Sequence, residues 1–97
     1  MGGLIGFNLV MEIYPKKWTK SDLNDTSIES GCYFVNVASN VTNSPEGFTR
    51  YLLIQFNLMG RDGVDSIAQL AFCWVGGPSY SELKSRSYYN GTWGSWK

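Results

Sequence analysis

The sequence contains no histidine and only two cysteines, Cys32 and Cys73, among its 97 residues. Zinc sites are built mainly from cysteine and histidine, so we expect no zinc site of the usual kind. Both cysteines lie in apolar stretches, where a reduced, buried thiol acts as a small hydrophobic side chain. The lack of histidine also removes the commonest base of acid–base and nucleophilic catalysis.

An excess of charge of one sign is also lacking. Eight basic and eight acidic residues give a formal net charge of zero. Such a chain has no net field to attract a polyanion, so we expect no nucleic-acid partner. Weak electrostatic repulsion between copies makes association of the chain with itself easier.

No hydrophobic run is long enough to cross a membrane as a helix. The apolar stretch 4–11 is interrupted by Glu12, and neither lysine nor arginine precedes it. A spanning helix needs about 20 apolar residues, and a signal peptide begins with a positively charged region. We therefore expect neither a signal peptide nor membrane insertion.

The residues that are abundant point to strands and turns. Hydrophobic residues make up 43% of the chain, which also contains eleven glycines, six tyrosines, five phenylalanines and four tryptophans. This length and composition predict one small all-β domain. Period-two alternation predicts strands at residues 4–14, 32–38, 51–59, 67–75, 83–89 and 92–96.

The connections between these strands predict their arrangement. Every link after residue 50 is short, which favours an antiparallel meander, packed on one face by the N-terminal part or by another subunit. Strands 51–59 and 67–75 are expected to form a hairpin, and residues 21–25 a single helical turn with Ser21 at its N-cap. Each of these two strands has a uniformly hydrophobic face, formed by Leu52, Ile54, Phe56 and Leu58 in one and by Ala68, Leu70, Phe72 and Trp74 in the other.

The pair Asn90-Gly91 predicts a tight terminal hairpin, because a type I′ turn needs positive φ at both central residues. This turn would set Tyr88 opposite Trp93, with Arg86 diagonal to Trp93 and within reach of a cation–π contact. Trp96 would lie on the opposite face unless Gly94 forms a bulge. The shared face would consist of Arg86, Tyr88, Trp93 and Ser95.

Such a mixture of aromatic, guanidinium and hydroxyl groups is typical of sugar-binding and protein-binding surfaces. Two simpler interpretations stay open: Trp93 and Trp96 would be core residues of the hairpin, and Arg86 a solvated charge on a strand. The candidate binding residues are Arg86, Tyr88, Trp93, Ser95, Asn90 and Tyr80.

Residues 84–97 (KSRSYYNGTWGSWK) resemble the closing motif of the pyocin-knob family, found in tail fibres and other tail proteins of bacteriophages and phage-derived bacteriocins. That motif is an arginine-bearing strand, a turn and a W-x-x-W strand. Three earlier segments fit in the same order: residues 22–25 (DLND), 31–35 (GCYFV) and 67–72 (IAQLAF). The resemblance covers residues 18–97 and leaves residues 1–17 as an N-terminal strand or linker.

The resemblance implies a knob-like domain of a phage or prophage tail fibre, located in the virion tail and assembled as a homotrimer, with no metal and no cofactor. Its partner would be a bacterial surface glycan or receptor. The alternative is a purely structural domain that trimerises or spaces the fibre. Gln69 and Arg86 would lie on neighbouring strands, joined by a buried hydrogen bond with a structural role.

A third hypothesis is a hydrolase that cleaves surface polysaccharide. Glycoside cleavage needs a pair of acidic residues in one cleft. The eight acidic residues lie mostly in predicted loops and turns, with no sign of a shared cleft. We therefore expect that the protein is not an enzyme.

Overall fold

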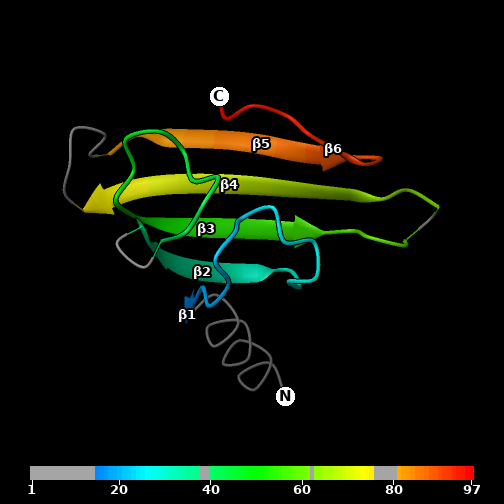
Figure 1. Cartoon of the computed structure of the whole chain (residues 1–97), viewed down its shortest axis with the longest axis horizontal. Coiled ribbons are helices and arrows are strands. Elements are labelled where there is room, and N and C mark those ends of the chain that lie inside the picture. Colours follow the sequence, from blue (N-terminus) through cyan, green and yellow to red (C-terminus); the bar gives the residue numbers. More distant parts are fainter. Residues whose placement is uncertain (1–14, 38–39, 62, 76–80) are drawn as a thin grey trace, which may run out of the picture.

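A computed structural model describes residues 15–37, 40–61, 63–75 and 81–97 (Figure 1). These residues form one six-stranded sheet in which the strands lie side by side in the order of the sequence. The protein is thus all-β, as predicted. The strands are β1 (Lys16–Lys17), β2 (Gly31–Asn36), β3 (Arg50–Asn57), β4 (Ser66–Val75), β5 (Leu83–Tyr89) and β6 (Thr92–Trp93).

The sheet is mixed, which corrects the expected wholly antiparallel meander. Strands β2 to β6 pair antiparallel, whereas β1 runs parallel to β2, with Lys16 opposite Tyr33. Two consecutive lysines carry no period-two hydrophobic pattern, so sequence reasoning missed this short edge strand. The strand predicted at residues 4–14 lies outside the described residues.

The segment before β2 makes a hydrogen-bonded turn at the position of the predicted helical turn. The amide of Asp25 donates to the carbonyl of Asp22 over 3.2 Å, and the Asp22 carboxylate accepts from the amide of Asn24 over 2.8 Å. Asp22 therefore takes the capping role expected of Ser21, as aspartate does in Asx turns. No helix in the described part of the chain is long and apolar enough to cross a membrane.

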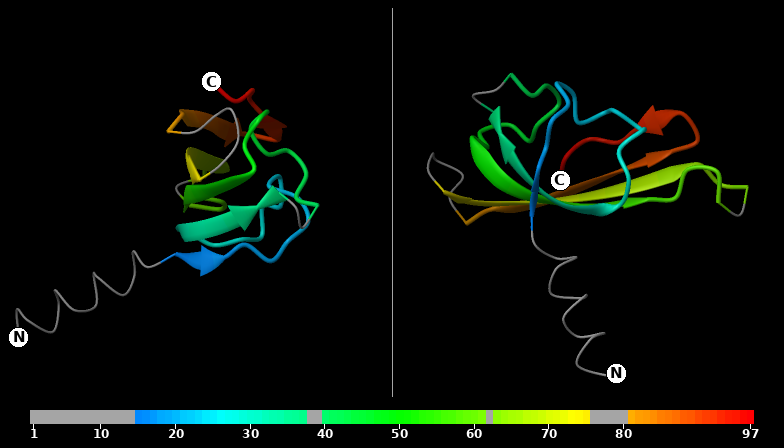
Figure 2. Two further views of the ribbon diagram at one scale, coloured as in Figure 1. Left: turned by 90° about the vertical axis from the view of Figure 1, so that its left-hand side faces the viewer. Right: turned by 90° about the horizontal axis from the view of Figure 1, so that it is seen from below.

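The hydrophobic core lies on one face of the sheet. Segments 18–30 and 40–48 cover this face, as the right-hand view of Figure 2 shows. Aromatic rings meet edge to face, with centroids 5.3 Å apart for Trp18 and Tyr33 and 5.6 Å apart for Phe48 and Tyr51. The buried core consists of Trp18, Leu23, Tyr33, Val35, Val41, Phe48, Tyr51, Leu53, Ala71 and Cys73.

The opposite face, which we call the open face, carries the side chains that alternate with the core residues. It includes Leu52, Ile54 and Phe56 of β3 and Ala68, Leu70 and Phe72 of β4, all from the hydrophobic faces predicted for these strands, and the described loops lie on the other side of the sheet (Figure 2). Phe56 is 59% exposed, Leu83 57% and Phe72 38%. The open face spans β2 to β5 and consists of Cys32, Phe34, Leu52, Ile54, Phe56, Ser66, Ala68, Leu70, Phe72, Leu83, Ser85, Ser87 and Tyr89.

The two cysteines are not joined in a disulfide, as expected. Cys73 is fully buried in the core, whereas Cys32 is only partly buried. Their strands place them on opposite faces of the sheet, because Tyr33 and Val35 fill the core side of β2. Burial raises the pKa of the Cys32 thiol above its ordinary value, which keeps it protonated at neutral pH.

The strained turn of the terminal hairpin generates the first prediction. Gly91 has φ of +100° and open space where a Cβ would lie, so Gly91→Ala should lower the free energy of unfolding by about 1–2 kcal/mol through backbone strain alone. The matched control is Gly94→Ala, whose Cβ would meet the Ser87 carbonyl at an ordinary 3.4 Å. Urea unfolding measures the free energy of unfolding of both variants, and the control should lose less than about 0.5 kcal/mol. Equal losses in the two variants would contradict the prediction.

Candidate functional site

The terminal hairpin forms as predicted. Asn90 and Gly91 both have positive φ, at 51° and 100°, as a type I′ turn requires. Tyr88 lies opposite Trp93, with ring centroids 5.2 Å apart, and Tyr89 lies opposite Thr92. The predicted aromatic pair is therefore confirmed.

Beyond β6 the hairpin contains a bulge, and this corrects the predicted orientation of Trp96. The amide of Gly94 donates to the carbonyl of Ser87 in regular register, but Ser85 then exchanges two 2.9 Å hydrogen bonds with Lys97. Two residues of the C-terminal segment thus oppose Arg86, which turns the second of them, Trp96, to the core side. The opposite face is expected for Trp96 only in the absence of a bulge at Gly94; a bulge is present, at Ser95 and Trp96 rather than at Gly94, and Trp96 packs against the core.

A row of three buried polar side chains crosses the core face at this point. Gln55 of β3, Gln69 of β4 and Arg86 of β5 lie directly opposite one another and are 1%, 1% and 9% exposed. Arg86 Nε donates to Gln69 Oε1 over 2.8 Å, and Gln69 Nε2 donates to Gln55 Oε1 over 2.7 Å. We call these three residues the polar row. The predicted buried hydrogen bond between Gln69 and Arg86 is confirmed.

The direction of these hydrogen bonds follows from the chemistry of the two ends. A guanidinium can only donate, so Gln69 must turn its oxygen to Arg86 and its NH₂ group away. The amide of Gln69 also donates to the carbonyl of Leu23 over 3.0 Å, and that of Gln55 donates to the carbonyl of Ile28 over 2.8 Å. The polar row therefore begins at a donor and ends at backbone acceptors, and it ties β3, β4 and β5 to the covering segment.

The charge of Arg86 is compensated by aromatic rings. No carboxylate in the described part of the chain forms an ion pair with it, but its Cζ lies 4.0 Å from the ring centroid of Trp93 and 4.7 Å from that of Trp96. Cation–π contacts are worth about 2 kcal/mol each when desolvated. Burial lowers the pKa of Arg86 from its ordinary value to about 10, so the guanidinium stays charged at neutral pH.

Trp96 also connects the C-terminal segment to the covering loops. Its indole Nε1 donates to the carbonyl of Asn43 over 2.9 Å, and the Asn43 amide donates to the Asp22 carboxylate over 2.7 Å. Hydrogen bonds from the Asn24 amide and the Asn43 side chain hold the pKa of Asp22 below its ordinary value. One indole thus contacts a buried cation and anchors both loops.

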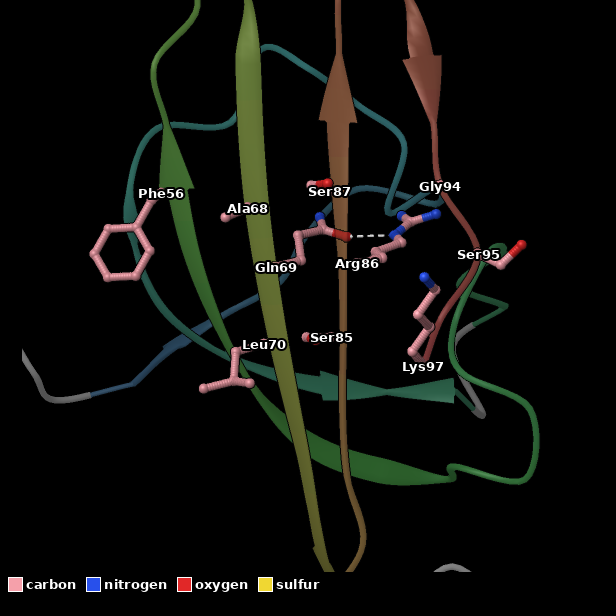
Figure 3. Close-up of a pocket in the computed structure, with 10 residues that line it drawn as sticks. All are labelled: Phe56, Ala68, Gln69, Leu70, Ser85, Arg86, Ser87, Gly94, Ser95 and Lys97. Atoms are coloured by element: carbon pink, nitrogen blue, oxygen red, sulfur yellow. Dashed lines mark hydrogen bonds between the residues drawn. The ribbon is translucent and has the colours of Figure 1, made fainter.

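A hollow of about 670 Å³ lies at the level of the polar row. Its walls come from β3, β4, β5 and the segment after β6 (Figure 3). Small side chains of Ala68, Ser85 and Ser87 leave the space open, with Phe56 and Leu70 at its rim. Gln69, Arg86, Gly94, Ser95 and Lys97 complete the lining.

The structure brings most of the predicted binding residues together, at different depths. Arg86 is buried and its contacts are structural, while its role in ligand binding remains a prediction. Tyr88 and Trp93 are partly buried, and Asn90 and Ser95 are exposed. Tyr80 lies outside the described residues.

Sequence reasoning missed Gln55, which is as deeply buried as Gln69. A glutamine between Ile54 and Phe56 in the most apolar strand was the available signal. It was not used because a polar residue in an alternating strand is normally assigned to the solvent face.

Comparisons of the chain with protein-family models, curated proteins and solved structures find no match.

The polar row generates a second prediction. Gln69→Leu removes the acceptor of a buried cation and should lower the free energy of unfolding by about 3 kcal/mol. Adding Arg86→Met to this variant removes the stranded charge, so the double variant should be at least about 1 kcal/mol more stable than the sum of the two single losses implies. Chemical denaturation of all four proteins measures this coupling. Additive losses would show that the two side chains do not act together.

A third prediction concerns acid stability. Because the folded-state pKa of Asp22 is lowered below 3.8, its carboxylate stabilises the fold at higher pH, and this contribution is lost as the pH falls through the folded-state pKa. Asp22→Asn keeps an oxygen acceptor but cannot titrate. Thermal midpoints measured from about pH 6 to about pH 2 should therefore fall less steeply in this variant than in the parent. Parallel curves would contradict the assignment.

Proposed function

We propose that the protein is a non-catalytic module of a phage or prophage tail fibre or tail protein that contributes to recognition of the host surface. The observation that carries this proposal is where its family-like segments meet. Segment 22–25 supplies the Leu23 carbonyl, segment 67–72 supplies Gln69, and segment 84–97 supplies Arg86 and both indoles. Three of the four family-like segments thus converge on one buried network, which supports a shared fold because such a network constrains the sequence at all of its members.

The surface proposed for recognition is the end of the terminal hairpin. The rings of Tyr88 and Trp93 contact each other at an interplanar angle of 58° and remain partly exposed, next to the exposed Asn90. The guanidinium of Arg86 packs against the Trp93 ring and fixes its position. Because the ring is ordered before a ligand arrives, little side-chain entropy is lost on binding. Flat rings beside amide groups suit the apolar faces and hydroxyls of sugars, so a bacterial surface polysaccharide is the proposed ligand.

The contacts of the acidic residues support a non-catalytic role. Asp22 accepts hydrogen bonds from Asn24 and Asn43, and Asp25 accepts two from Ser27. These carboxylates hold turns in place, whereas glycoside cleavage needs two acids on either side of a bound sugar.

The second candidate function is a structural domain that joins or spaces fibre segments. The open face favours it, because large apolar side chains such as Phe56 and Leu83 are more than half exposed there. Recognition and assembly are compatible, since the hairpin end and the open face are different surfaces.

The fourth prediction tests recognition with neighbouring tyrosines on opposite faces. The whole chain is incubated with arrayed bacterial surface polysaccharides, and Tyr88→Ala should weaken binding by roughly tenfold or more, because it removes a stacking ring. Tyr89→Ala is the matched control, since Tyr89 is 63% exposed but lies on the other face. Binding that survives Tyr88→Ala, or that only Tyr89→Ala abolishes, would contradict this location of the site.

A further inference from the structure

The open face is at least as hydrophobic as the core side on the two central strands. On β3 the core side holds Tyr51, Leu53 and Gln55, whereas the open side holds Leu52, Ile54 and Phe56. On β4 the core side holds Ile67, Gln69, Ala71 and Cys73, and the open side holds Ala68, Leu70 and Phe72, so here the two sides are similarly apolar. A sheet gains free energy by burying apolar surface, so this distribution indicates that a further layer covers the open face.

The open face carries no charged side chain among these members. The charged residues Lys17, Arg50 and Lys97 lie at its margins, on the edge strand β1, at the end of β3 and at the rim of the hollow. Two copies can therefore pack face to face without burying a charge, and the zero net charge of the chain adds no repulsion.

The size of the open face also favours a whole sheet as its cover. Four strands spaced about 4.8 Å apart, each contributing about seven residues at about 3.3 Å, give a patch on the order of 20 Å by 23 Å. A single helix about 10 Å wide covers only half of that width. With side-chain relief, the patch approaches the roughly 600 Å² per partner found at the low end of stable interfaces.

We propose that the open face binds the open face of a second copy of this chain, forming a two-sheet sandwich about a two-fold axis parallel to the strands and between β3 and β4. Packed sheets keep their strands within about 30° of each other and lie about 10 Å apart. Such an axis brings β3 of each copy over β4 of the other. Because Phe56 pairs with Ala68 in the sheet, the axis carries each Phe56 ring to the partner's Ala68 and into its hollow.

The same register sets the other apolar residues against each other across the axis. Within one sheet Ile54 pairs with Leu70, and Leu52 pairs with Phe72. Across the axis, Ile54 of one copy therefore meets Leu70 of the other, and Leu52 meets Phe72. The large Phe56 thus opposes a position where small side chains leave space, which is the complementarity that close packing requires. This inference does not rest on the proposed function, because it uses only the sheet and its exposed side chains.

The fifth prediction is tested with the whole chain by sedimentation equilibrium from low to several hundred micromolar. The parent protein should form dimers, and Phe56→Glu should raise the dimer dissociation constant by about a hundredfold, because two copies of the residue each contribute about tenfold. Val64→Glu is the matched control: Val64 is 41% exposed but lies in the β3–β4 turn, outside the open face, and this variant should stay dimeric. Leu83→Glu is a second disrupting variant, and circular dichroism verifies that each variant is folded.

Several results would overturn the sandwich. The sandwich is excluded if the parent protein stays monomeric at the highest concentration. In that case, a lower thermal midpoint of Phe56→Glu than of the parent would indicate that another part of the same chain covers the open face. A trimer, the assembly that the family resemblance implies, would exclude the two-fold arrangement. A dimer that survives both Phe56→Glu and Leu83→Glu would place the interface elsewhere.

Discussion

A buried positive charge, which forms no ion pair with any carboxylate in the described part of the chain, constrains most of this structure. The guanidinium of Arg86 is 9% exposed and stays protonated, so its surroundings must offer acceptors and electron-rich surfaces. Gln69 supplies the acceptor, and two indoles supply the π faces. The bulge after Gly94 is what allows both tryptophans of the W-x-x-W segment to reach the same cation, since regular pairing would put Trp96 on the other face.

This arrangement relates the stability of the domain to its proposed role. Gln69 accepts from Arg86 and donates to Gln55, and both glutamines donate to backbone carbonyls of the covering segment. Loops and strands are therefore ordered together. Trp93, held by Arg86, then pairs with Tyr88 at the end of the hairpin. A rigid aromatic pair of this kind suits recognition of a sugar, whereas the buried guanidinium below it has a supporting role.

Burial of the polar row on the core face also has a consequence for the other side of the sheet. Three positions that would otherwise contribute apolar side chains to the core are polar, and large hydrophobic residues of β3 and β4 lie on the open face as well as in the core. The sheet therefore has two faces that both favour burial, one covered by loops of the same chain and one available to a second copy. The open face of this sheet therefore resembles the inner face of one sheet of a β-sandwich.

Local pattern determined much of this fold. Alternation located β2 to β5 nearly to the residue, and Asn90-Gly91 set the hairpin register, because both signals depend only on neighbouring residues and the geometry of one turn. The family resemblance paired Gln69 with Arg86. Local pattern could not decide which face of β3 is the core, because Leu53 and Leu52 are equally hydrophobic and the choice depends on what the polar row and the covering loops bury. The orientation of Trp96, the place of Gln55 and the parallel strand β1 were likewise decided only in the tertiary structure, where long-range hydrogen bonds to Ser85, Ile28 and Phe34 compete with local preference.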